Sequence, residues 1–391
     1  MIFLIRFYES IIEYFKRTDF ILWLLSGSTI IYSLLLIFSM QRSGTYNFMG
    51  TQTLAVIIGS VMAVIISLAD YRVLLKKWYF AAAISVLLLL SVFLFGIQVE
   101  GTDDTAWLNI AGLSVQPSEF VKILFIITFS SHLHYLHEKN LIASFSGVVT
   151  LVLHAAVPMA VIHIQGDDGT VLIFAFIFLV MTFTAGVQKR YFAILAGGLL
   201  VGIPLIWTFF LNNEHRNRFL ALFDIDGNAM TNYGWQQYQG KISIASGGLF
   251  GEGYQNGTRV EYGIVPEQEN DFILTVTGEE FGFIGCILIL LLLSAIALKI
   301  LFNGEKSNDL RGKYICSGVF GLIASQTIIN IGMVLGFLPV VGITLPFFSA
   351  GGTSVMSLLI CIGLVQSVIC HNIDDMNTVS IRRETIRRTR L

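Results

Sequence analysis

The chain has 391 residues, of which 55% are hydrophobic and only 13% charged, and its mean hydropathy is +0.75. This composition argues against two or three soluble domains and favours a single polytopic membrane domain. The net charge of −2 argues against a nucleic-acid partner.

Ten apolar runs are long enough to cross a bilayer as helices, and the first is too long for the core of a signal peptide. The sequence therefore predicts an all-α membrane protein with about ten transmembrane helices, a single domain over residues 1–391, and both termini on one side. The runs cover residues 20–40, 53–69, 79–97, 119–136, 146–164, 169–185, 191–211, 271–301, 314–337 and 349–370.

The basic residues indicate which side of the membrane each loop faces. If the N-terminus is cytoplasmic, all but six of the 24 Lys and Arg residues fall in or beside cytoplasmic segments. The exceptions are Arg42, Lys122, Arg216, Arg218, Lys241 and Arg259. The positive-inside rule thus predicts cytoplasmic termini, a long extracellular loop at 212–270 and a cytoplasmic tail at 371–391. We interpret the basic tail as a topology signal rather than a lipid-binding site.

The first outer loops carry unusual charges. Arg42 is the only basic residue in a short outer loop, and Glu119 and Lys122 lie at the start of the fourth span. Their i,i+3 spacing lets them pair where the lipid begins. An ordinary capping and snorkelling pair is the alternative. The next outer turn, QGDDGT at 165–170, holds Gln165 and Asp167, which could equally serve the backbone of a turn.

Two glycine-rich segments lie on the same predicted side. In the long loop, ISIASGGLFGEGYQNGT is flanked by Lys241 and Arg259, and such backbone amides with nearby cations can hold a pyrophosphate. The aromatic residues of this loop predict that it lies along the membrane surface. The last outer loop, FLPVVGITLPFFSAGGTS, contains Ser349 and Thr353 between prolines and glycines that allow a close approach of the backbone.

Asp271 lies where the chain enters the hydrocarbon, in GIVPEQENDFILTVTGEEFGFIG at 263–285. Placing a carboxylate beside the lipid core costs free energy, so a functional site is the default hypothesis for Asp271. The alternative is an N-cap, provided by Asn270 or Asp271, for the helix that follows. Burial would raise the pKa of Asp271, whereas a helix N-terminus or a cation would lower it, and the sequence does not decide between them.

Several of these segments together resemble the SEDS family, the membrane glycosyltransferases RodA, FtsW and SpoVE. PEQENDFILTVTGEEFGFIG is similar to PExxxDFIxxxxxEExGxxG, and the residues from Trp107 to Lys122 are similar to WxxxxxxxxQPSExxK. QGDDGT resembles QPDxGT with Gly166 in place of Pro. The last outer loop resembles LPVVGIxLPxxSYGGSS with Ala350 in place of Tyr. ISIASGGLFGEGYQNGT in the long loop resembles SxxAIGSGGxxGxGxxxGT, and the GT that ends this loop motif, Gly257 and Thr258, is most similar to the RodA branch.

The resemblance implies a glycosyltransferase that polymerises lipid II into β-1,4 glycan with inversion. Asp271 would be the base or would position the acceptor hydroxyl, and a class B penicillin-binding protein would be a partner. A divalent cation, Mg²⁺ or Mn²⁺, bound by Asp271 is a further expectation, because the available ligands are carboxylates and amides. Glu279 and Glu280 are expected to pack between helices rather than to act in catalysis. The residues expected to bind lipid II or undecaprenyl-pyrophosphate-linked glycan are Arg42, Glu119, Lys122, Gln165, Asp167, Lys241, Arg259, Ser349 and Thr353.

Two other classes of protein stay open on the sequence. A flippase for lipid-linked precursors would place charged residues near the middle of the membrane and repeat its helical pattern, and we find no such repeat. A non-catalytic scaffold for a transpeptidase would leave Asp271 dispensable. Within the resemblance, a division or sporulation polymerase similar to FtsW or SpoVE is the alternative to a RodA-like role.

Overall fold

The computed structural model describes residues 13–41, 48–97, 105–110, 113–209, 213–223 and 234–388, with the backbone alone described for 206, 214, 215 and 373–388. Each predicted apolar run forms a helix, so the all-α prediction is confirmed. Arg42 lies outside the described residues. The ten helices are α2 (Phe20–Met40), α3 (Phe48–Leu68), α5 (Trp78–Phe95), α6 (Pro117–Glu138), α7 (Phe145–Ile164), α8 (Asp168–Thr184), α9 (Lys189–Phe209), α13 (Ile273–Glu305), α14 (Leu310–Val334) and α15 (Gly352–Arg388).

Within the described part of the chain, eight helices are long and apolar enough to cross a membrane. The other two helices of the bundle are α6, which carries several charged and polar residues, and α8, which has only 17 residues. Both pack against α14 in the bundle, where protein rather than lipid surrounds much of their surface. A polytopic membrane protein is therefore confirmed, and the number of ten crossings stays a prediction.

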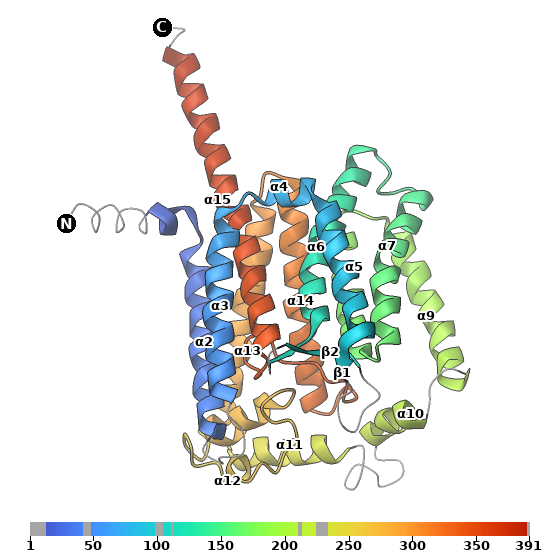
Figure 1. Ribbon diagram of the computed structural model, residues 1–391, viewed down its shortest axis with the longest axis vertical. Helices are drawn as coiled ribbons and strands as arrows, with labels where there is room; N and C mark the ends of the chain where they lie inside the picture. The colour runs from blue at the N-terminus through green and yellow to red at the C-terminus, as the bar shows by residue number, and fades with distance from the viewer. Residues whose placement is uncertain are drawn as a thin grey trace, which may run out of the picture.

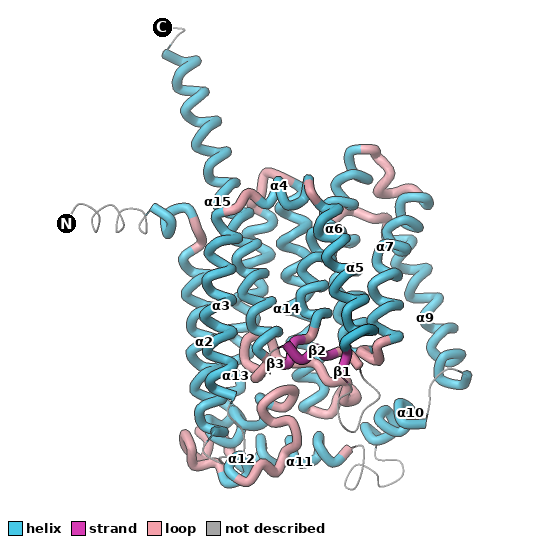
Figure 2. Tube along the Cα trace, viewed as in Figure 1, coloured by secondary structure: helices cyan, strands magenta, loops and turns pink. Residues whose placement is uncertain are grey.

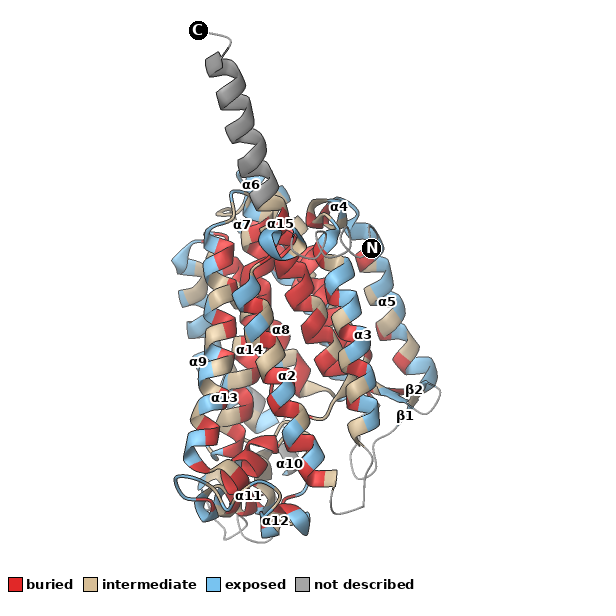
Figure 3. Ribbon diagram, turned by 90° about the vertical axis from the view of Figure 1, so that its left-hand side faces the viewer, coloured by how far each residue is buried: buried red, intermediate tan, exposed pale blue. Residues whose placement is uncertain are grey.

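The helices form a bundle whose buried residues lie along its axis (Figures 1 and 3). Helix α15 packs closely along α3, and the contact depends on small residues. A Cβ added to Gly363 would lie 2.4 Å from the Ala63 carbonyl oxygen, and one added to Gly59 would lie 2.8 Å from Leu359. Small residues let helix backbones approach closely in membranes, where no hydrophobic effect drives helices together.

The two ends of the bundle differ. The end where α2 begins also holds α4 (Tyr71–Lys76), and α15 projects from it. The opposite end holds α10 (Asn213–Leu220), η2 (Ala221–Phe223), α11 (Trp235–Ser246), α12 (Thr258–Glu261) and a small antiparallel sheet (Figure 2). The sheet has three strands, β1 (Gly96–Ile97), β2 (Trp107–Ile110) and β3 (Leu113–Val115), which the sequence analysis did not predict.

Helix α13 is broken near its N-terminal end. Gly282 has φ 66° and ψ −162°, a conformation open only to glycine. The loop after α11 fills the break: Glu252 and Gly253 donate backbone hydrogen bonds to Glu279 and Glu280, while Phe283 and Ile284 donate to Gly248 and Leu249. The free backbone groups of the broken helix are thus satisfied by protein, as burial in a membrane requires.

Candidate functional site

Asp271 lies in the turn that precedes α13, at the end of the bundle that carries α11 and α12. The N-cap of α13 is Phe272, which provides no side-chain cap, and the Asn270 amide instead donates to the Glu267 carboxylate at 2.7 Å. The proposed N-cap role of Asn270 or Asp271 is therefore not observed. The Asp271 carboxylate, which is partly buried, forms no hydrogen bond or ion pair with any side chain that the structure describes.

The surroundings of Asp271 decide the question that the sequence left open. Burial, together with the negative charges of Glu267 and Glu269, raises the pKa of Asp271 to about 7. The pKa of Glu269 is also raised by burial. No cation among the described residues acts against these effects. A carboxylate with a pKa near the working pH is suited to accept a proton from a hydroxyl group.

Residues 337–351, the part of the last outer loop that precedes α15, lie against the Asp271 turn. Gly342 has φ 67°, and a Cβ at this position would lie 3.6 Å from Asp271 Oδ2. Ser349 is 1% exposed, and its hydroxyl donates to the Asn270 carbonyl oxygen at 2.6 Å. The predicted substrate ligand Ser349 is therefore engaged within the protein, where it holds the loop on the Asp271 turn.

Glu119 and Lys122 form a buried ion pair at the start of α6. Lys122 Nζ lies 2.8 Å from Glu119 Oε1, and Ser357 of α15 donates to Glu119 Oε2 at 3.0 Å. The side chains are only 6% and 1% exposed. Desolvated charges of this kind are stable only when both are paired and hydrogen-bonded. The predicted pairing is confirmed, although the pair lies inside the bundle rather than at its surface.

Further predicted residues join the same polar cluster. Asp167 caps α8 by accepting from the Thr170 backbone at 2.9 Å, and its second oxygen accepts from the Gln116 amide at 2.8 Å. Burial raises the pKa of Asp167. The Gln116 backbone donates to Thr353 Oγ1 at 3.4 Å. Gln165 lies nearby and donates to the Leu89 carbonyl oxygen at 2.9 Å. This cluster joins α6, α8 and α15 beneath the outer loops.

The two predicted cations of the long loop lie on or beside α11 and α12. Lys241 is exposed and forms no ion pair with a described residue, and its Nζ is the atom nearest to the Cβ position of Gly336. The Arg259 guanidinium is half-buried and donates to Ser243 Oγ at 2.8 Å and to the Gln239 side chain. Neither side chain forms an ion pair with a carboxylate of a described residue.

Glu279 and Glu280 hold the outer segments together, as their predicted packing role implies. Glu279 Oε1 accepts backbone hydrogen bonds from Arg259 at 2.6 Å and Val260 at 3.3 Å, which fixes the start of α12. Glu280 accepts a hydrogen bond from Ser39 of α2. These contacts anchor the long loop and α2 to the broken part of α13.

A resident metal does not fit the described residues. They contain no group of three or more His, Cys, Asp or Glu side chains that could hold an ion. The Mg²⁺ or Mn²⁺ expected on Asp271 therefore has no set of three such ligands among the described residues, and it stays a prediction.

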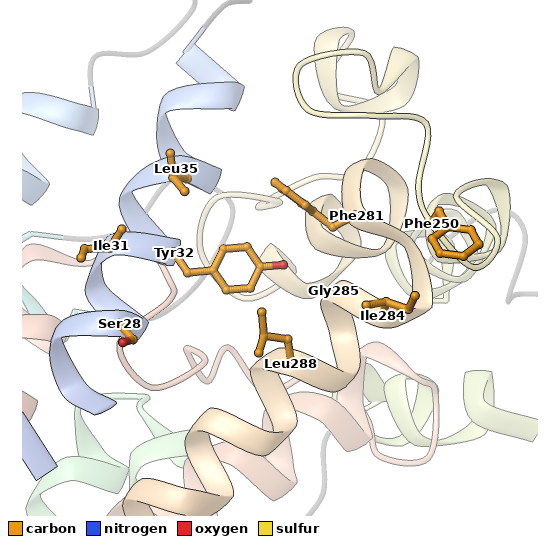
Figure 4. A pocket seen from close by; sticks show the side chains of 9 residues that line it. All are labelled: Ser28, Ile31, Tyr32, Leu35, Phe250, Phe281, Ile284, Gly285 and Leu288. Atoms are coloured by element: carbon orange, nitrogen blue, oxygen red, sulfur yellow. The ribbon is translucent and has the colours of Figure 1, made fainter. Parts of the chain in front are cut away.

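An apolar groove opens between α2 and α13, beside the break in α13 (Figure 4). It has a cavity volume of about 570 Å³, and its lining includes Tyr32, Phe250, Phe281 and Leu288. Tyr32 also packs edge-on against Phe348 of the last outer loop, with ring centroids 5.6 Å apart. Tyr32 thus contacts both this groove and the loop that lies against the Asp271 turn.

Sequence reasoning missed Asn330, which contacts the Asp271 turn from α14. Its amide donates to the Asp271 carbonyl oxygen at 2.7 Å, and the residue is fully buried. The signal was present, because a buried amide in an apolar helix is costly and is usually kept for a specific partner. The sequence alone could not indicate which partner.

Comparison with known proteins now adds to this geometry. The profile of the cell cycle protein family that comprises FtsW, RodA and SpoVE matches residues 16–373. The chain belongs to this family. It is 32% identical to stage V sporulation protein E of Bacillus subtilis over 72% of this chain and 75% of the relative. It is 30% identical to the probable peptidoglycan glycosyltransferase FtsW of the same organism over 88% and 86%.

The FtsW/RodA/SpoVE fold is also found in solved structures. Rod shape determining protein RodA of Thermus thermophilus covers 90% of this chain with a TM-score of 0.65 and 23% identity. A chain of a peptidoglycan synthase complex that couples polymerization and crosslinking covers 91% with a TM-score of 0.78 and 24% identity. The peptidoglycan glycosyltransferase MrdB of Escherichia coli is 29% identical over 74% of this chain and 76% of its own. Since identities to the branches are similar, the expected closeness to RodA is not resolved.

Proposed function

We propose that this protein is a peptidoglycan glycosyltransferase that polymerises lipid II into β-1,4 glycan strands at the outer face of the plasma membrane. The observation that carries the proposal is Asp271, a partly buried carboxylate that forms no hydrogen bond or ion pair with a described side chain and whose pKa is raised to about 7. Relatives named as peptidoglycan glycosyltransferases support the reaction class.

The chemistry requires one proton acceptor. The 4-hydroxyl oxygen of the acceptor sugar attacks C1 of the donor sugar, the bond between C1 and the pyrophosphate oxygen breaks, and the hydroxyl proton passes to Asp271. A single displacement inverts C1 and needs no covalent enzyme intermediate. Lys241 and Arg259, with Arg42 outside the described residues, are the cations proposed to offset the charge of the departing pyrophosphate.

The buried polar cluster has a different part in this proposal. Glu119, Lys122, Gln165, Asp167, Ser349 and Thr353 bond mainly to protein groups, so their contribution to substrate binding is to fix the outer loops. A single loss at the Glu119–Lys122 pair leaves the other charge buried and unpaired, which is strongly destabilising. A loss of activity in variants of this cluster can therefore be interpreted as a loss of substrate binding only after the variants have been shown to fold.

The decisive experiment measures polymerisation of purified lipid II by the wild type and by Asp271→Asn, alone and with a class B penicillin-binding protein, with Mg²⁺ or Mn²⁺ and with a chelator. We expect glycan chains from the wild type and at least a 100-fold lower rate from Asp271→Asn, because the amide cannot accept the proton. Glu261→Gln, which neutralises an exposed carboxylate of the same outer region, is the matched control and should retain full activity.

Each alternative has its own result. Equal rates for wild type and Asp271→Asn would remove Asp271 from the mechanism. If the wild type makes no glycan with its partner but moves lipid II across vesicle membranes, the flippase hypothesis replaces ours. If the partner alone polymerises lipid II as fast as the complex does, the protein is a non-catalytic scaffold for the transpeptidase. Loss of activity on chelation would establish the need for a divalent cation.

The cellular role is proposed to be RodA-like, in wall synthesis during elongation. The support is the Gly257–Thr258 ending of the loop motif, which is most similar to the RodA branch. Complementation tests this directly: the gene should restore growth and rod shape to cells depleted of RodA, but not division to cells depleted of FtsW. The reverse pattern would assign the chain to the division branch.

A further inference from the structure

Three consecutive carbonyl groups of the Asp271 turn are each bound by a different donor. The Glu269 carbonyl oxygen accepts from the Ala350 backbone at 2.7 Å, that of Asn270 accepts from Ser349 Oγ at 2.6 Å, and that of Asp271 accepts from Asn330 Nδ2 at 2.7 Å. Two donors come from the last outer loop and the third from α14. The backbone before α13 is therefore fixed residue by residue from outside its own segment.

Asn330 connects more elements than the other donors. The same amide nitrogen donates a second hydrogen bond to the Ile343 carbonyl oxygen at 2.7 Å, and the residue is 0% exposed. Ile343 follows Gly342, whose Cβ position would lie 3.6 Å from Asp271 Oδ2. One side chain thus holds both the Asp271 turn and the loop segment against which the carboxylate lies.

This arrangement determines where the carboxylate can point. With its own carbonyl oxygen bound and the adjacent one bound too, the Asp271 backbone has little freedom, and the side chain retains mainly its own rotations. The Asp271 carboxylate forms no hydrogen bond with a described residue, so nothing else orients it. Because a catalytic group displaced by about 1 Å can lose 100-fold in rate, the orientation of the backbone becomes part of catalysis.

We propose that Asn330 is a positioning residue for glycan polymerisation, which fixes Asp271 and the Gly342–Ile343 segment in one geometry through its two amide hydrogen bonds. This inference rests on the proposed role of Asp271 as proton acceptor. Asn330 itself does not touch the substrate, because it is fully buried between α14 and the two segments that it binds.

The test compares Asn330→Leu, which has a similar size and no donors, with Asn330→Ser, which can supply one hydrogen bond. We expect Asn330→Leu to lower kcat about 100-fold with a less than threefold change in KM for lipid II, and Asn330→Ser to retain an intermediate rate. Gln326→Met is the matched control, since Gln326 is a buried amide on the same helix that forms no hydrogen bond to the Asp271 turn. It should keep the wild-type kcat.

A pH profile separates positioning from a general loss of structure. The charges that act on Asp271 are those of Glu267 and Glu269 on its own segment, while the last outer loop has no titratable side chain. Wild-type kcat should rise with pH through a midpoint near 7. In Asn330→Ser the looser turn admits water to the carboxylate, so the midpoint should move to lower pH. A purely structural defect would scale the rate equally at every pH.

Parallel measurement of Asp271→Asn distinguishes the two proposals. If Asp271→Asn is inactive while Asn330→Leu and Asn330→Ser show wild-type kcat and an unshifted midpoint, the role of Asn330 is disproved and that of Asp271 survives. If Asp271→Asn is fully active, the proposed role of Asp271 as proton acceptor is disproved, and the role of Asn330 that rests on it is disproved too. Should Asn330→Leu not fold, Asn330→Ser and Ser349→Ala decide, and wild-type kcat with unshifted midpoints in both would overturn the inference.

Discussion

At the scale of the residue, the ionised carboxylate of Asp271 destabilises the folded protein. Its carboxylate is partly buried beside two acidic neighbours, and burial raises its pKa to about 7. In the unfolded chain the same group has its ordinary value of 3.8, so the native state binds more protons than the unfolded state between these limits. Stability therefore falls as the pH rises from about 4 to about 7, and the full penalty is present above pH 7.

Asp271→Asn should consequently be more stable than the wild type in alkaline solution. The gain should be absent at pH 4, grow toward pH 7 and reach at most about 4 kcal/mol above it, since each pKa unit corresponds to about 1.36 kcal/mol. Thermal unfolding in detergent at pH 4 and pH 8 measures this. An equal change in Tm at the two pH values would show that ionisation of the Asp271 carboxylate does not destabilise the folded protein.

At the scale of the element, most of the helices could be predicted because a helix that crosses the bilayer needs about 20 mainly apolar residues in a row. The run predicted at 271–301 is observed as Ile273–Glu305, and the run at 20–40 as Phe20–Met40. The break at Gly282 could not be predicted, because the loop that fills it lies some 30 residues earlier and its contacts are tertiary. For the same reason the sequence could place Asp271 at a membrane boundary but could not find Asn330.

The break predicts a sharp difference between two glycines. A Cβ at Gly282 would lie 2.4 Å from the Gly251 nitrogen, whereas one at Gly198 on α9 would meet nothing within 4 Å. Gly282→Ala should therefore cost about 2–4 kcal/mol, through positive φ and overlap with backbone, and should release the loop at 247–257. Gly198→Ala should be neutral or stabilising by up to about 1 kcal/mol.

Limited proteolysis and thermal unfolding check this pair. Cleavage within the loop at 247–257 should accelerate in Gly282→Ala and stay at the wild-type rate in Gly198→Ala. Equal cleavage of both variants would mean that the loop does not depend on the broken helix. The backbone N–H groups of Arg259 and Val260, which follow this loop in α12, donate hydrogen bonds to the Glu279 carboxylate, so release of the loop should lower polymerisation as well.

At the scale of the whole molecule, the two ends of the bundle have different chemistry. The end with Asp271 contains the break at Gly282, the exposed Lys241 and the polar cluster around Asp167. The other end is tied by Asp19, which lies before α2 and binds Lys299 of α13 at 2.9 Å and Asn303 at 3.0 Å. Gln366 of α15 exchanges two hydrogen bonds with the Asp19 backbone. These contacts hold α2, α13 and α15 together at the end of the bundle opposite to the Asp271 site.

The orientation of these ends in the membrane is the last prediction. The distribution of Lys and Arg places the Asp271 end outside, and the four native cysteines are all buried, so engineered cysteines can be labelled over a low background. Tyr262→Cys, at a position 75% exposed beside α12, should react with an impermeant maleimide in intact cells. Lys306→Cys, exposed in the turn between α13 and α14, should react only after the membrane is permeabilised. The opposite pattern would place Asp271 in the cytoplasm, where a polymerase that builds the wall outside the membrane could not use it.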